Sequence, residues 1–77
     1  MIPPHVRVPP FTLWQLTSRA GTAECKLQRL PAGDDLRLFL DGELQRTALC
    51  STADEWLQLA FDWRMALEAE GYRENAG

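Results

Sequence analysis

The sequence has few of the residues from which active sites and metal centres are built. Its only histidine is His5, and its two cysteines, Cys25 and Cys50, match neither a zinc motif nor a CxxC redox pair. The five glycines stand singly, so there is no glycine-rich phosphate loop. Ser18 and Ser51 have no histidine and carboxylate placed to activate them. We therefore expect a protein that is not an enzyme and that holds no metal, cofactor or small-molecule ligand.

Long apolar runs are also missing. No stretch approaches the roughly 20 apolar residues that a membrane-spanning helix needs. The first ten residues hold four prolines and no apolar run, which argues against a signal peptide and predicts an extended arm over residues 1–10. This arm is either a loose terminus or a segment that packs on its own domain or on a neighbour. A cytoplasmic protein with reduced thiols is the simplest prediction, and a Cys25–Cys50 disulfide is the less favoured alternative.

The chain is short and mildly acidic. Its 77 residues form one domain, and a core of this size rarely supplies more than about 3–5 kcal/mol of net stability. Small domains add a disulfide, a metal or a partner subunit, and only the partner subunit is compatible with this composition. The net charge of −3 argues against a dedicated nucleic-acid binder. The negative charge is concentrated in residues 51–77, which hold six acidic and two basic side chains.

Patterns of period two predict strands in the first two thirds of the chain. The predicted strands cover residues 11–18, 23–30, 36–40 and 43–50, separated by a turn at 19–22 and a loop at 31–35. Asp41-Gly42 is a strong hairpin signal. A two-residue loop would pair Phe39 with Leu44, whereas a three-residue loop would pair Leu40 with Leu44. The two registers differ by one residue, which moves every side chain of the strand to the other face.

A long helix is the clearest predicted element. It covers residues 52–70, begins with a capping box in which Thr52 and Glu55 bond to each other, and ends at Gly71. Tyr72 is expected to fold back on the last turn, and residues 73–77 to fray. The predicted fold is therefore α+β: a three- to four-stranded antiparallel β-meander, packed against one long C-terminal amphipathic helix, within a single domain of residues 11–72.

The helix has a wider apolar arc than one sheet should need. The arc covers about 220°, whereas a stripe of about 100° is enough to face a core. Its centre and two flanks are formed by Trp56, Ala60, Trp63 and Leu67, by Leu57 and Phe61, and by Leu59 and Ala66. Leu59 and Phe61 lie on opposite flanks, so one sheet cannot bury both. Arg64 projects from the arc. Its stem packs while the guanidinium reaches solvent, or the guanidinium stacks on Trp63, Trp14 or Tyr72, or Arg64 is an anchor in an interface. The candidate interface residues are Trp56, Leu59, Phe61, Trp63 and Arg64.

The run from Cys25 to Gly71 resembles small bacterial proteins with a β-meander followed by one helix. The shared features are a leucine-rich strand, an Asp-Gly-Glu-Leu turn, a Trp-Arg pair in an acidic helix and a final Gly-aromatic pair. Here these are residues 36–40, 41–44, 63–64 and 71–72. The resemblance covers about two-thirds of the chain and carries turn and packing signals only, so it implies no function.

Three functions are compatible with these features. The first is a non-enzymatic protein-interaction domain, either a homodimer or a small subunit of a complex. The second is an acidic regulator that docks on a nucleic-acid-handling protein, using the helix carboxylates Asp54, Glu55, Asp62 and Glu68. The third is weak nucleic-acid binding by the open face of the sheet. Its candidate contacts are Lys26, Arg37, Phe39 and Arg46.

Overall fold

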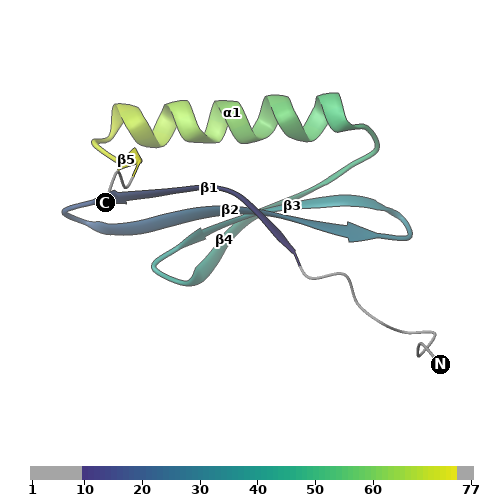
Figure 1. Cartoon of the computed structure of the whole chain (residues 1–77), viewed down its shortest axis with the longest axis horizontal. Helices are drawn as coiled ribbons and strands as arrows, with labels where there is room; N and C mark the ends of the chain where they lie inside the picture. Colours follow the sequence, from purple (N-terminus) through teal and green to yellow (C-terminus); the bar gives the residue numbers. More distant parts are fainter. Residues whose placement is uncertain (1–9, 75–77) are drawn as a thin grey trace.

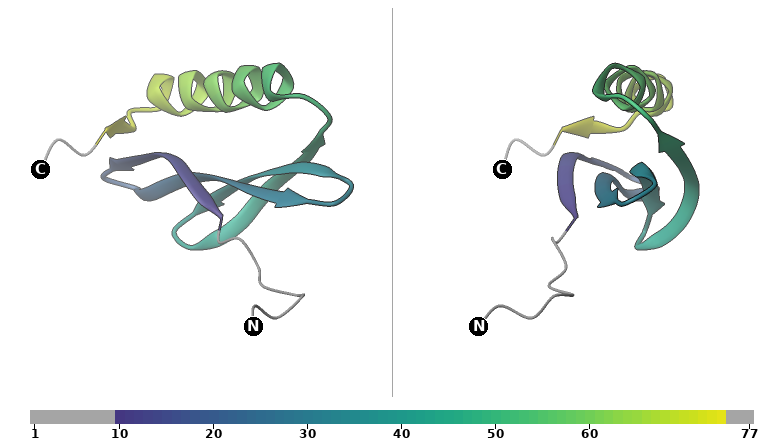
Figure 2. Two further views of the ribbon diagram at one scale, coloured as in Figure 1. Left: turned by 45° about the vertical axis from the view of Figure 1, so that its right-hand side comes forward. Right: turned by 90° about the vertical axis from the view of Figure 1, so that its right-hand side faces the viewer.

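The computed structural model describes residues 10–74, which form one antiparallel sheet and one helix in two layers (Figure 1). The elements are β1 (Phe11–Ser18), β2 (Gly21–Leu30), β3 (Gly33–Leu40), β4 (Glu43–Cys50), α1 (Ala53–Ala69) and β5 (Arg73–Glu74). The strand order is β4-β3-β2-β1-β5. The predicted α+β fold is confirmed, with four meander strands and a short fifth strand. Figure 2 shows α1 on one side of the twisted sheet, whose opposite face no described element covers.

Three predicted boundaries change. The predicted turn at 19–22 is shorter, because Gly21 and Thr22 belong to β2 and pair with Ser18 and Thr17 of β1. The predicted loop at 31–35 is a two-residue turn, because Asp34 and Asp35 continue β3 and pair with Arg29 and Gln28 of β2. Opposite charges at Asp34 and Arg29 favour this longer hairpin. The predicted fraying from residue 73 is wrong for Arg73 and Glu74, which form β5 beside β1. The predicted arm, apart from Pro10, and residues 75–77 lie outside the described residues.

The β3–β4 hairpin contains both registers that the sequence allowed. Asp41 and Gly42 have positive φ angles of 52° and 82° and form a two-residue turn, so that Phe39 lies opposite Leu44. One step further the register shifts, and Leu38 lies opposite Arg46. Gln45 is therefore an extra residue, a β-bulge. Beyond the bulge, β4 follows the register that a three-residue loop would have produced.

The core lies between the sheet and the helix. Alternate residues of β2 and β3 point to this side and are buried, as the period-two pattern predicts. The buried cluster consists of Leu16, Ala23, Cys25, Leu27, Leu36 and Leu38 from the sheet, with Ala60, Trp63, Leu67 and Tyr72 from the helix and its end. Each of these positions removes apolar surface from water, which is the main favourable contribution to folding.

Both ends of α1 are closed by hydrogen bonds. At the start, the Thr52 hydroxyl accepts from the Glu55 N–H at 3.3 Å and lies 3.4 Å from the Glu55 carboxylate, to which it donates. At the end, Gly71 has a φ of 103°, and the Tyr72 N–H donates to the Leu67 carbonyl at 3.1 Å. This is a Schellman motif. The predicted cap, stop and fold-back of Tyr72 are all confirmed.

Candidate interaction surfaces

Three of the five candidate interface residues pack on the protein's own core. Trp63 is only 9% exposed, and Trp56 and Leu59 are partly buried against the core cluster. The Trp56 Nε1 donates to Asp34 of β3 at 3.2 Å. In a second hydrogen bond of the same kind, the Trp14 indole N–H of β1 donates to the Ala60 carbonyl at 3.1 Å. These tryptophans attach the helix to its sheet, and this leaves them less surface for a partner.

A line of exposed apolar side chains runs along the outer flank of α1. Leu57, Phe61 and Met65 are 54%, 58% and 49% exposed. Residues four positions apart share one flank of a helix, so the three form a continuous row that we call the helix stripe. Phe61 is the one candidate interface residue that lies in it. Met65 was not among the predicted interface residues, although its spacing of four from Phe61 was the available signal.

Arg64 lies beside the helix stripe and binds carboxylates. Its Nε is 3.2 Å from Glu68 of the same helix, and its Nη2 is 3.4 Å from Glu74 of β5. The hydrogen bond that Arg64 donates to the Glu68 carboxylate is the main reason why the pKa of Arg64 is raised. Of the alternatives that the sequence left open for Arg64, stacking on an aromatic ring is not the one observed within residues 10–74, where the guanidinium forms these ion pairs. Arg64 thus ties the end of α1 to β5.

The open face of the sheet carries two of the predicted cations, each beside a carboxylate. Lys26 and Arg37 lie directly opposite each other. Lys26 is 4.0 Å from Glu24, and Arg37 is 2.7 Å from Asp35. The Lys26 ammonium also lies 5.5 Å from the centre of the Phe39 ring. Charge on this face is therefore locally balanced, which reduces its attraction for phosphate groups.

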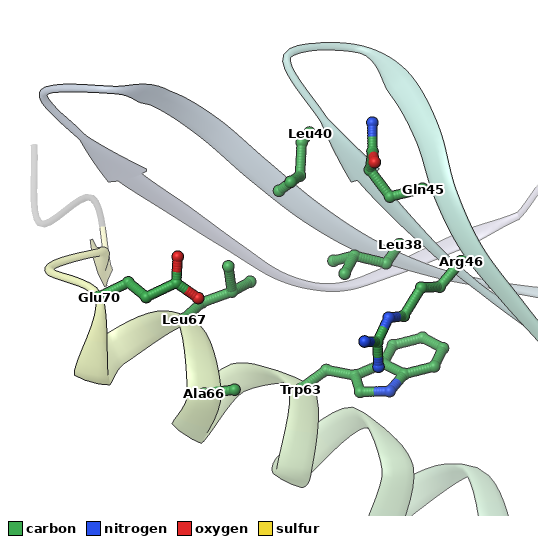
Figure 3. Close-up of a pocket in the computed structure, with 8 residues that line it drawn as sticks. All are labelled: Leu38, Leu40, Gln45, Arg46, Trp63, Ala66, Leu67 and Glu70. Atoms are coloured by element: carbon green, nitrogen blue, oxygen red, sulfur yellow. The ribbon is translucent and has the colours of Figure 1, made fainter.

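Arg46 does not lie on the open face, contrary to the prediction. The bulge at Gln45 places it opposite Leu38, on the side of the sheet that faces α1. There it borders a groove of about 230 Å³ between the helix and the β3–β4 hairpin (Figure 3). The groove is lined by the apolar Leu38, Leu40, Trp63, Ala66 and Leu67, and by the polar Gln45, Arg46 and Glu70.

The two thiols are free and belong to the core. Cys25 and Cys50 are 0% and 2% exposed. Burial raises the pKa of Cys25 to about 12, and burial followed by nearby carboxylates raises the pKa of Cys50. Both thiols are therefore neutral and poorly nucleophilic at neutral pH. Residues 10–74 bring no three potential metal-ligating side chains together. No helix in the same range is long and apolar enough to span a membrane.

Comparison with protein families, with curated proteins and with solved structures finds no match. The resemblance to small bacterial proteins therefore stays a prediction. What the protein does has to be inferred from its own surfaces, which are the helix stripe, the open face and the groove.

Proposed function

We propose that this chain is a small non-enzymatic protein-interaction domain that forms a homodimer through the helix stripe. The observation that carries the proposal is the exposure of Leu57, Phe61 and Met65 in one row. Large apolar side chains are usually scattered on a monomer surface, and a contiguous row is typical of an interaction site. The wide apolar arc of the helix is thus divided between the core and this second surface.

The spacing of the row favours a second copy as its partner. Leu57 and Met65 are equally distant from Phe61 along the helix, so the row is symmetric about Phe61. Two antiparallel copies of α1 on a two-fold axis would place Phe61 against Phe61 and Leu57 against Met65, which is a self-complementary contact. In this arrangement Asp54 of one copy is level with Glu68 of the other, and Arg64, the only cation in Ala53–Ala69, lies one turn away from that pair and offsets part of its negative charge.

The size of the stripe indicates a weak dimer. About half of each of three large side chains is exposed, which is on the order of 300 Å² per copy. A standard stable interface buries about 800 Å² per partner, so we expect a dissociation constant in the micromolar range. Assembly should therefore depend on protein concentration.

The test is the solution mass of the full chain across a concentration series. Sedimentation equilibrium should show a shift from the monomer mass of 8.7 kDa towards twice that value. Phe61→Asp should remain a monomer at every concentration, because two carboxylates would face each other at the axis, and its helix content should be unchanged. Leu49→Asp is the matched control: Leu49 is also 58% exposed but lies on the open face, and this variant should dimerise normally.

A strict monomer at millimolar concentration would exclude the homodimer. Equal weakening of the dimer by Phe61→Asp and Leu49→Asp would exclude the helix stripe as its interface. The nucleic-acid alternative receives less support from the structure, because Lys26 and Arg37 are paired with carboxylates and Arg46 lies on the other face. The acidic-regulator alternative gains no additional observation.

A further inference from the structure

The edge of β4 is open. The strand pairs with β3 on one side and ends the sheet on the other. Within residues 10–74, no backbone hydrogen bond reaches its outer side. An unpaired edge of eight residues is a template on which another extended chain can add a strand.

The groove beside this edge holds unused polar groups next to an apolar surface. Figure 3 shows Arg46 extending from β4 towards Trp63, while Gln45, which also lines the groove, points towards the tip of the hairpin. Within residues 10–74, the Arg46 guanidinium, the Gln45 amide and the Trp63 indole N–H have no hydrogen-bond or ion-pair partner. A strand added to β4 would direct alternate side chains to this side of the sheet, where Leu38, Leu40 and Leu67 offer apolar contact.

The position of Arg46 disfavours a second copy of β4 as the added strand and favours a strand that carries a carboxylate. An inward-pointing charge and a bulge on an edge strand both oppose pairing with an identical edge. A second copy of β4 would bring a second Arg46 to the same groove, where the like charges repel. A strand carrying a carboxylate at that place would instead form an ion pair with the unpaired guanidinium. Glu70 also lines the groove, at the end opposite to Arg46 (Figure 3), so the partner's carboxylate has to lie beside Arg46 and away from Glu70. At that place the charge favours an acidic partner residue over a second copy of this chain.

We propose that the β4 edge binds an extended acidic peptide segment of a partner protein by strand addition. One apolar side chain of that segment enters the groove against Trp63, and a neighbouring carboxylate on the same face binds Arg46. This site is separate from the helix stripe, so a monomeric Phe61→Asp variant keeps it. Failure of the homodimer and failure of the peptide site are therefore independent results.

The test is selection of peptides from a phage-displayed library of random seven-residue sequences on the immobilised full chain. Enriched peptides should carry an acidic residue two positions from a large apolar one, because alternate residues share a face. Selection on Arg46→Glu should change the preference from acidic to basic residues. Arg19→Glu is the control for charge reversal, because Arg19 lies in the exposed β1–β2 turn, and it should leave the acidic preference unchanged.

Strand addition is tested with N-methylated forms of the best acidic peptide, measured by fluorescence anisotropy. Methylating the alternate amides that face β4 should weaken binding at least about tenfold, and methylating the other set should change it little. Amide shifts on binding should be largest in Arg46–Cys50. No enrichment, an acidic preference that survives Arg46→Glu in a folded variant, or equal binding by both methylated sets would each overturn the proposal.

Discussion

Deletion of Gln45 tests the register of the β3–β4 hairpin. Phe39 lies opposite Leu44 and Leu38 lies opposite Arg46, so the bulge residue stands between two pairs that are already consecutive on β3. Removing it should therefore keep every cross-strand pair and close the strand into a regular ladder. Gln45 is exposed and has no partner within residues 10–74. Deleting Gln45 removes the conformational entropy cost of ordering one residue, which is about 1–2 kcal/mol. This gain should roughly balance the loss of the contacts that Gln45 makes in the groove.

The expected change in the free energy of unfolding is within about 1 kcal/mol. The measurement is urea denaturation of the deletion variant, followed by tryptophan fluorescence. NMR contacts between Leu38 and Arg46 in the unmodified chain check the assigned pairing. If β4 instead followed the two-residue register throughout, the same deletion would exchange the two faces beyond residue 45. Ala48 and Cys50 would move from the open face to the core, and Leu49 from the core to solvent. Exposing one leucine side chain costs about 1.5–3 kcal/mol.

Deletion of Thr47 is the control, since it shortens the same strand by one residue. To keep Cys50 buried, the bulge would have to close and place Arg46 opposite Arg37, and like charges directly opposite each other are destabilising. To keep the bulge, Cys50 would have to turn outward. Either rearrangement should make this variant at least about 2 kcal/mol less stable than the Gln45 deletion. Equal losses in the two variants, or a loss above about 3 kcal/mol on deleting Gln45, would contradict the assigned register.

Three further variants test two turns and the buried thiol. Gly21→Ala should lower the free energy of unfolding by about 2–4 kcal/mol, measured by thermal denaturation. The φ angle is 142°, and the new Cβ would displace the Asp41 carboxylate that accepts from the Thr22 N–H. Gly42→Ala, whose Cβ would lie in open space, should lower it by only about 1 kcal/mol. The raised pKa of Cys25 stabilises the fold fully below pH 9, and this contribution should fall by up to about 1.4 kcal/mol per pH unit as the pH rises from 9 towards 12. Cys25→Ala should flatten that slope, and an unchanged slope would show that the thiol does not cause it.

Local signals predicted most of the fold. The helix ends could be read because caps act within one turn: Thr52 reaches Glu55, and Gly71 adopts a φ that disfavours other residues. The β-bulge could not be read, because no single residue type marks it and the choice of register depends on what each face packs against. That one extra residue moved Arg46 from a predicted nucleic-acid contact to the groove. Asp34 and Asp35 were assigned to a loop for the same reason, since their partners lie on another strand.

The division of the helix between core and stripe was predictable only in part. Helical periodicity predicts Leu59 and Phe61 on opposite flanks, and in the structure Phe61 is exposed while Leu59 packs on the core. It could not say which flank the sheet would cover. That choice depends on the hydrogen bonds from Trp14 and Trp56, which fix the rotation of α1 about its axis. Both bonds join residues far apart in the sequence, beyond the reach of helical periodicity.

Both candidate surfaces follow from one geometric mismatch. A helix is about 10–12 Å across with its side chains, whereas five strands spaced by about 4.8 Å span about 19 Å from first to last. One helix therefore cannot cover this sheet, and the hydrogen bonds that Trp14 of β1 donates to the helix and that Trp56 donates to Asp34 of β3 fix where α1 lies across the strands. The groove beside β4 is the uncovered remainder of the sheet, and the helix stripe is the uncovered remainder of the helix. Trp63 and Leu67 belong to both the core and the groove wall. A partner strand on β4 would thus extend the same core that holds the helix in place.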